Sequence, residues 1–271
     1  MRIGEILDLA EDSVAVSDEA VENASAALLA FFADHPTETF YEGQLKVIFE
    51  KPFFHWVTTN ALRLLVATGA LASELVPASP FALRFYRLPR HRYWTRQANE
   101  IIKLVQEFSA PAFTDGLGRQ GEMMWDAALP RGGFIPTGND VRSYLGKTWT
   151  ASGHDLDRCV MRDGLHYGIE IKNTLPYIPR QELTIKLQMC AYFGIRPLFI
   201  ARMHPKSYIE EIRQAGGYGL VFKYQLYPHG HADFAKRVRD RLLLPVDCPR
   251  AIADGTIDRL VKWHLSSIPS H

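Results

Sequence analysis

The sequence predicts a mixed α/β protein of two domains, for three reasons. Its 271 residues are enough for two modest domains or one large one. The part before residue 110 has the pattern of three helices followed by two strands, whereas the rest alternates between strands and helices. The composition, 47% hydrophobic and 23% charged, is ordinary for a globular chain and excludes a disordered, collagen-like or coiled-coil protein. We therefore expect one domain over residues 1–110 and a second over residues 111–271.

The first domain is predicted from its apolar spacing and its turn residues. Apolar side chains recur at helical intervals before His35-Pro36-Thr37, which ends the first helix. Gly69 suits the left-handed residue that closes the third helix, and Pro77-Ala78-Ser79-Pro80 suits a turn between two strands. The expected elements, three helices and then two strands, cover residues 19–33, 41–51, 52–68, 71–76 and 81–88.

Three short helices followed by a β-hairpin resemble a winged helix-turn-helix domain, and Phe53–Leu71 resembles the third helix of that family. In the family this helix enters the major groove of DNA, and the hairpin contacts the backbone or the minor groove. The resemblance implies DNA contacts from helix and wing residues, which are His55, Thr58, Thr59, Asn60, Arg63, Arg84 and Arg87. In the alternative, the arginines form an ordinary solvated surface and the domain contacts protein.

The net charge of +1 hides an uneven distribution of charge along the chain. Residues 1–42 carry ten acids and one base, residues 43–109 four acids and nine bases, and residues 110–271 sixteen acids and twenty-one bases. Within Phe81–Lys103, six bases stand against the single acid Glu100, and aromatic residues are interleaved with them. This mixture is typical of phosphate contacts combined with aromatic stacking, so we expect DNA as a partner.

The sequence also predicts where the protein works. No apolar run reaches the roughly 18 residues that a membrane-spanning helix needs, so we expect no membrane partner. The segment that starts at Met1 lacks the pattern of a secretory signal. The three cysteines match neither a disulfide framework nor a zinc site, and we interpret them as reduced thiols in the cytoplasm.

The second domain is predicted to alternate between helices and strands. Asp163-Gly164 stands between two β-prone segments and is typical of a tight hairpin turn. The last part of the chain has the pattern of amphipathic helices rich in lysine and arginine. The expected elements are helix 121–129, strands 155–161 and 165–172, helix 181–193, strand 197–201 and helices within 232–268.

The hairpin brings together residues that suit metal-dependent chemistry. Side chains alternate across a strand, so Glu170 and Lys172 point to the same face, and a hairpin of this length can place Asp157 beside Glu170. Two carboxylates at one point favour a hard divalent cation such as Mg²⁺ or Mn²⁺. Lys172 beside that ion would orient or deprotonate an attacking water and help to neutralise charge that develops on a phosphate.

These residues resemble the PD-(D/E)xK nuclease superfamily, whose restriction-endonuclease-like fold is a mixed β-sheet flanked by helices. The match covers about residues 118–225 and runs through the helix with Glu122, the Asp157 strand, Glu170-Ile171-Lys172 and the following helix and strand. The resemblance implies an endonuclease that hydrolyses DNA, with Asp157 and Glu170 as Mg²⁺ ligands, Lys172 as the catalytic lysine and Glu122 as a supporting ligand. In these families the following helix often adds a polar residue, here Lys186 or Gln188.

Several alternatives remain open at this point. Leu156 stands where the motif has proline, and Asp155 competes with Asp157 as the metal ligand because both lie on one strand face. Glu170 and Lys172 also suit an exposed strand face without metal. Nucleases of this fold often act as homodimers. The contrasting class of function is a DNA-binding regulator or scaffold whose nuclease-like domain does not cut.

Overall fold

The computed structural model describes residues 18–268. The chain forms two compact units, and the break between them falls inside helix α6 (Pro111–Ala128), between Thr114 and Asp115. The segment Lys236–Leu244 belongs to the first unit, although it lies far along the sequence. A single domain boundary at residue 110 therefore does not account for Lys236–Leu244.

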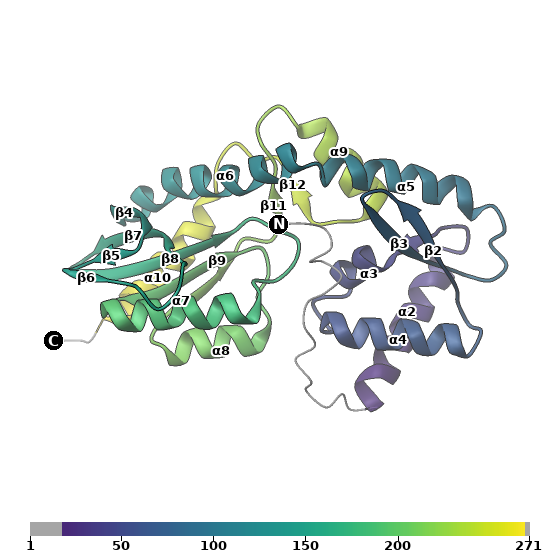
Figure 1. The fold of residues 1–271 in the computed structure, drawn as a ribbon, viewed down its shortest axis with the longest axis horizontal. Helices are drawn as coiled ribbons and strands as arrows, with labels where there is room; N and C mark the ends of the chain where they lie inside the picture. The colour runs from purple at the N-terminus through teal and green to yellow at the C-terminus, as the bar shows by residue number, and fades with distance from the viewer. Residues whose placement is uncertain (1–17, 269–271) are drawn as a thin grey trace. The chain divides into compact units, whose positions relative to one another are not determined.

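The first unit contains helices and a small antiparallel sheet in the order β1-β3-β2 (Figure 1). The three expected helices and the expected hairpin are all present. The elements are α2 (Asp18–Asp34), β1 (Phe40–Tyr41), α3 (Glu42–Ile48), α4 (His55–Ala67), β2 (Ala72–Ala78), β3 (Phe81–Arg87) and α5 (Trp94–Phe108). Most of α9 (Ala232–Leu242) completes this unit.

One apolar core holds the first unit together. It joins Leu28 of α2, Leu45 of α3, Ala61 of α4 and Tyr86 of β3, all buried. Helix α5 is not among the expected elements, because Phe81–Lys103 was interpreted as a binding surface from its basic and aromatic residues. Its buried residues nevertheless follow helical spacing, at Ile101, Ile102, Leu104, Val105 and Phe108.

The second unit is built on a five-stranded mixed sheet in the order β10-β9-β8-β7-β4. Strands β4, β7 and β8 pair antiparallel, whereas β8, β9 and β10 pair parallel. The strands of this sheet are β4 (Ile135–Val141), β7 (Leu156–Arg162), β8 (Leu165–Lys172), β9 (Arg196–Ala201) and β10 (Tyr218–Val221). The smaller elements are the 3-10 turn η1 (Leu129–Gly132), β5 (Ser143–Tyr144), β6 (Lys147–Thr148), β11 (Gln225–Leu226) and β12 (Val246–Asp247).

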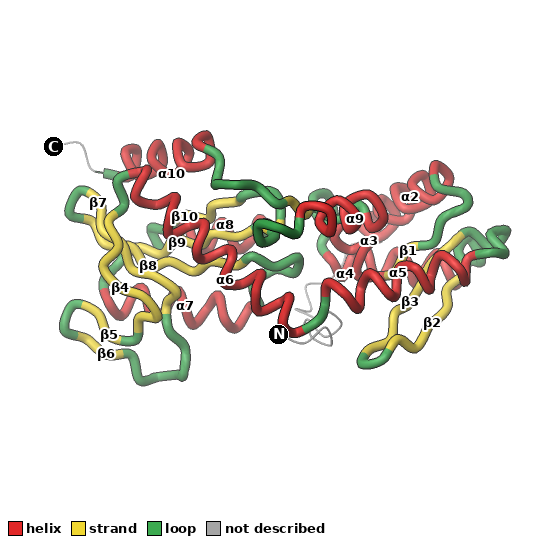
Figure 2. Tube along the Cα trace, turned by 90° about the horizontal axis from the view of Figure 1, so that it is seen from above, coloured by secondary structure: helices red, strands yellow, loops and turns green. Residues whose placement is uncertain are grey.

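Helices cover both faces of this sheet (Figures 1 and 2). One face packs against α6 and α10 (Asp254–Ser267). The other packs against α7 (Arg180–Phe193) and α8 (Lys206–Gln214), through the buried side chains of Leu183, Phe199 and Ile212. The expected mixed sheet flanked by helices is thus confirmed.

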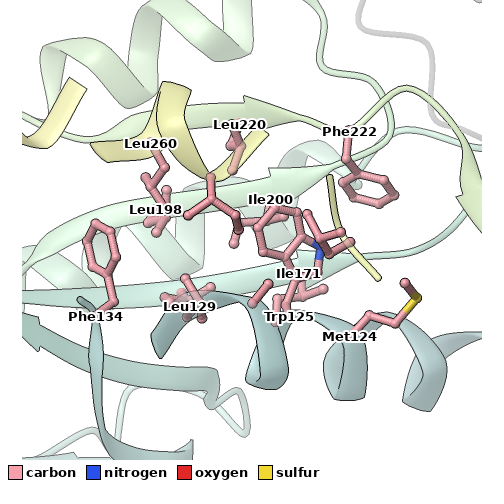
Figure 3. Packing of buried hydrophobic residues seen from close by; sticks show 14 of the residues in the cluster. Met124, Trp125, Leu129, Phe134, Ile171, Leu198, Ile200, Leu220, Phe222 and Leu260 are labelled. Atoms are coloured by element: carbon pink, nitrogen blue, oxygen red, sulfur yellow. The ribbon is translucent and has the colours of Figure 1, made fainter. Parts of the chain in front are cut away.

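The larger core lies between the sheet and the α6–α10 face (Figure 3). Trp125 of α6 is fully buried and packs with Ile171, Ile200 and Phe222. Burial of large apolar side chains such as these contributes about 1.5–3 kcal/mol each. Because Ile169 and Ile171 face this core, the residues that alternate with them on β8 face the opposite helices.

The expected helix and strand bounds are close to the observed ones except at α6. That helix begins at Pro111, ten residues before the expected start at Gly121. Gly116 and Gly118 lower the helix propensity of its first half. No helix within residues 18–268 is long and apolar enough to cross a membrane.

Candidate functional site

The register of β7 and β8 sets Asp157 against Glu170. Arg158 lies opposite Ile169 and Cys159 opposite Gly168, so one step further along the hairpin Asp157 comes opposite Glu170. Side chains directly opposite in an antiparallel pair point to the same face. Gly168 is two residues before Glu170 on β8 and therefore lies on the same face of the sheet. Helix α7 covers this face, because a Cβ built on Gly168 would come 2.8 Å from the Cys190 sulfur of α7.

The Glu170 carboxylate is buried between two lysines. Its exposed fraction is 1%, and its Oε1 lies 2.7 Å from Lys172 Nζ while its Oε2 lies 2.5 Å from Lys186 Nζ. Burial raises the pKa of Glu170 to about 7, with a further contribution from Asp157, despite the two lysines. A buried carboxylate with two cations at this distance is a strong local centre of charge.

Helix α7 completes a four-residue ion-pair cluster, which we define as Glu170, Lys172, Glu182 and Lys186. Glu182 Oε1 lies 2.8 Å from Lys172 Nζ, so this ammonium bridges two carboxylates. Glu182 and Lys186 are four residues apart, which places both on the helix face toward the sheet. Burial alone would lower the pKa of Lys172, but Glu170, Glu182 and Asp157 outweigh it and hold that pKa above its usual range.

Asp157 is tied to the strand that carries Glu170. Its Oδ2 accepts a hydrogen bond of 2.6 Å from the backbone N–H of Ile171. Burial raises the pKa of Asp157, and the charge of Glu122 adds to this, although Lys172, Lys186 and the Ile171 N–H oppose it. The cluster and Asp157 therefore act on one another electrostatically.

Glu122 is held by an arginine on the other face of the sheet. Arg158 donates from Nη2 to Glu122 Oε2 at 2.9 Å and from Nε to Asp126 Oδ1 at 2.8 Å. Its Nη1 also donates to the Asp157 carbonyl oxygen at 2.6 Å. Glu122 thus stands near Asp157 but has an arginine as its partner, so the structure does not place it as a third ligand beside Asp157 and Glu170.

The other residues predicted from the sequence, Lys186, Gln188 and Asp155, differ in their relation to the cluster. Lys186 enters the cluster, whereas Gln188 is exposed, because two residues along α7 turn its side chain away from the sheet. Asp155 precedes β7, its carbonyl oxygen accepts a hydrogen bond from Lys186, and its carboxylate is 4.0 Å from the same Nζ. The position opposite Glu170 belongs to Asp157, not to Asp155.

The donor set suits magnesium better than a metal that requires many protein ligands. Within residues 18–268, no group of three histidine, cysteine, aspartate or glutamate side chains is arranged to hold a metal ion. Mg²⁺ usually takes one or two carboxylates and keeps several waters. Both Glu170 oxygens are buried, and each has a lysine ammonium at ion-pair distance. Asp157 and Glu170 therefore fit a two-carboxylate Mg²⁺ or Mn²⁺ site, in which the cation would take the place of a lysine at Glu170.

In the first unit, the predicted DNA-contacting residues have different environments. Arg63 of α4 and Arg84 of β3 are exposed, and the charges of both act on the Tyr86 hydroxyl, so they lie near one another. Thr58 is fully buried and its hydroxyl donates to the Phe54 carbonyl oxygen at 3.4 Å, so it cannot make the expected surface contact.

Other predicted contacts are engaged within the unit. Thr59 donates to Glu42 Oε1 at 3.2 Å, and the Arg87 guanidinium lies 4.2 Å from the centre of the Trp94 ring. His55 and Asn60 are half-buried on α4. Of the seven predicted residues, Arg63 and Arg84 present the most open positive charge.

Sequence reasoning missed Glu182, Arg158 and Asp126. The four-residue spacing between Glu182 and Lys186 indicates that both lie on one helix face, and the same holds for Glu122 and Asp126. The sequence does not predict the role of Arg158, because that role depends on which helix covers its face of the sheet.

No protein-family model, curated protein or solved structure matches the chain.

Proposed function

We propose that the chain is a metal-dependent DNA endonuclease of the PD-(D/E)xK type, with a restriction-endonuclease-like domain preceded by a winged helix-turn-helix domain. One observation carries the proposal. Asp157 lies opposite Glu170 on adjacent strands, and the Lys172 ammonium stands 2.7 Å from the Glu170 carboxylate on the same buried face. The sheet order, with antiparallel β7–β8 beside parallel β8–β9, is consistent with that fold.

In this proposal, Asp157 and Glu170 hold Mg²⁺ or Mn²⁺. A cation held there would supply a coordinated water of lowered pKa and would offset negative charge on the phosphate. Hydrolysis forms a bond between the water oxygen and phosphorus, as the water gives up a proton to solvent. It breaks the bond from phosphorus to the leaving sugar oxygen, which takes up a proton from solvent. The chain's own task is to hold the two carboxylates in place, and the Ile171 N–H does this for Asp157 while opposing the rise of its pKa on burial.

Lys172 acts as a hydrogen-bond donor. Because Glu170 and Glu182 hold its pKa above the usual range, its amine keeps its proton at neutral pH. A charged ammonium can orient the attacking water and stabilise charge on a phosphoryl oxygen, but it cannot take a proton from the water. Glu182 fixes the ammonium from the helix side.

The first unit supplies DNA binding in this proposal. Arg63 and Arg84 offer exposed positive charge on the helix and the wing, which is suited to phosphate contacts. Affinity that depends on phosphates falls steeply between low and physiological salt. A salt titration of DNA binding by wild type, Arg63→Ala and Arg84→Ala measures this contribution.

A cleavage assay tests the catalytic proposal. The full chain is incubated with linear duplex, single-stranded and branched DNA, with Mg²⁺, with Mn²⁺ and with a chelator. We expect cutting that requires the metal and is lost in Asp157→Asn and in Lys172→Ala. Absence of metal-dependent cutting on all three substrates, or cutting that survives both substitutions, would overturn the assignment.

The second candidate is a DNA-binding regulator or scaffold that does not cut. It is favoured by the charge balance of the ion-pair cluster, in which two acids and two bases neutralise each other without a metal. Such a cluster could serve only to fasten α7 to the sheet. DNA binding that is unaffected by Mg²⁺ and by Asp157→Asn, without cleavage, would support this candidate.

A further inference from the structure

A hollow of about 420 Å³ lies on the first unit. Its walls come from the turn after α2 and from the loop between β3 and α5. The residues that line it are Pro36, Thr37, Arg90, His91, Arg92 and Tyr93. None of them belongs to the proposed catalytic site, and four of them lie in Phe81–Lys103, the basic and aromatic segment that predicts a DNA partner.

The arginines of this loop differ from their neighbours in sequence. Arg90 and Arg92 are exposed, and no carboxylate among residues 18–268 lies within ion-pair distance of either one. By contrast, Arg87 lies over Trp94, and Arg96 pairs with Glu100 at 3.4 Å. The hollow is therefore flanked by two guanidinium groups whose charge is available to an anion.

The other two loop residues offer an aromatic face and a nitrogen atom. Tyr93 is 88% exposed, the most of any large hydrophobic side chain in the described part of the chain. The Nε2 atom of His91 is shielded from solvent and has no hydrogen-bond partner within the described residues, so the ligand contacts come from Tyr93 and the two arginines.

We propose that the loop Arg90–Tyr93 and its hollow bind one unstacked nucleotide of a single-stranded DNA segment. Tyr93 stacks on the base, and Arg90 and Arg92 contact the flanking phosphates. An aromatic ring between cations is the usual platform for single strands, because every base has a face that can stack. The inference rests on the proposed function in that DNA is the ligand, and it narrows the substrate to DNA with a single-stranded part.

Fluorescence anisotropy with the full chain and a labelled oligothymidylate tests this proposal, with a chelator present so that no strand is cut. We expect Tyr93→Ala to weaken binding about tenfold, in keeping with the loss of one stacked base. Tyr93→Phe should bind as the wild type does, because it keeps the ring. Arg90→Ala and Arg92→Ala should each reduce the slope of log affinity against log salt by about 0.7, whereas Arg250→Ala, at another exposed arginine, should leave it unchanged.

Three outcomes would overturn the subsite. The first is the absence of oligothymidylate binding by the wild type. The second is binding by Tyr93→Ala that equals that of the wild type. The third is a loss of affinity in Tyr93→Ala that is as large on duplex DNA as on the single strand. Tyr93 lies outside the proposed catalytic cluster. If the single-strand subsite is refuted, metal-dependent cleavage is still tested by Asp157→Asn, so the two proposals can fail separately.

Discussion

Replacing Lys186 by methionine should make the stability of the protein depend on pH in a new way. Lys186 and Glu170 are both buried, with their charged atoms 2.5 Å apart. In the wild type, burial raises the pKa of Glu170 to about 7, above its ordinary value of 4.5. Without Lys186 that pKa rises further, so the folded variant keeps the Glu170 proton to higher pH while the unfolded chain has lost it.

The magnitude follows from linkage between protonation and folding. Above pH 7 the free energy of unfolding of the variant, relative to the wild type, should fall by about 1.4 kcal/mol per pH unit until the new pKa is reached. The limit is about 3–5 kcal/mol, the typical cost of breaking a buried pair. Near pH 6, where Glu170 is mostly protonated in both proteins, the Glu170 contribution to the difference should nearly vanish.

Urea denaturation of Lys186→Met and the wild type at pH 6, 7 and 8 measures the effect. Lys206→Met is the matched control, because Lys206 is exposed on the neighbouring helix α8. A difference in unfolding free energy that is the same at pH 6 and pH 8, or that the control reproduces, would refute the reasoning.

Three further predictions follow from the same geometry. Mn²⁺ binding should release about one proton from Glu170 at pH 6 and almost none at pH 8.5. Titration calorimetry in two buffers of different ionisation enthalpy measures the number of protons released, and equal release at the two pH values would contradict this prediction. Glu182→Gln should lower the rate of DNA cleavage about tenfold without changing Mn²⁺ affinity, because it loosens the neighbouring ammonium, and Glu182→Asp should restore part of the rate. Gly121→Ala should destabilise the protein by about 1–3 kcal/mol in thermal unfolding, because its Cβ would come 2.6 Å from Asn173 Cβ, whereas Gly118→Ala, with open space around it, should stabilise it by up to about 1 kcal/mol.

The local elements of the site could be predicted because their information is local. The alternation of Ile169 and Ile171 with Glu170 and Lys172 gives the two faces of β8, and the Asp163-Gly164 turn gives the register of the hairpin. Together they allow Asp157 to lie beside Glu170, although Asp155 stayed a competitor for that place from the sequence alone.

The partners of those residues could not be predicted, because they depend on which helix covers which face. Glu182 reaches Lys172 only because α7 packs on the Glu170 side of the sheet, and Glu122 meets Arg158 only because α6 packs on the other side. Thr58 shows the same limit within a helix. A polar residue on α4 was expected at the surface, but tertiary packing buries it.

Diffraction at the manganese absorption edge, from crystals of the full chain grown with Mn²⁺ at pH 8, tests the central claim most directly. The account predicts one anomalous peak in contact with carboxylate oxygens of both Asp157 and Glu170, with Lys186 Nζ moved away from Glu170, and no such peak in Asp157→Asn. An undisturbed contact between Lys186 and Glu170, with no manganese between the two carboxylates, would contradict it.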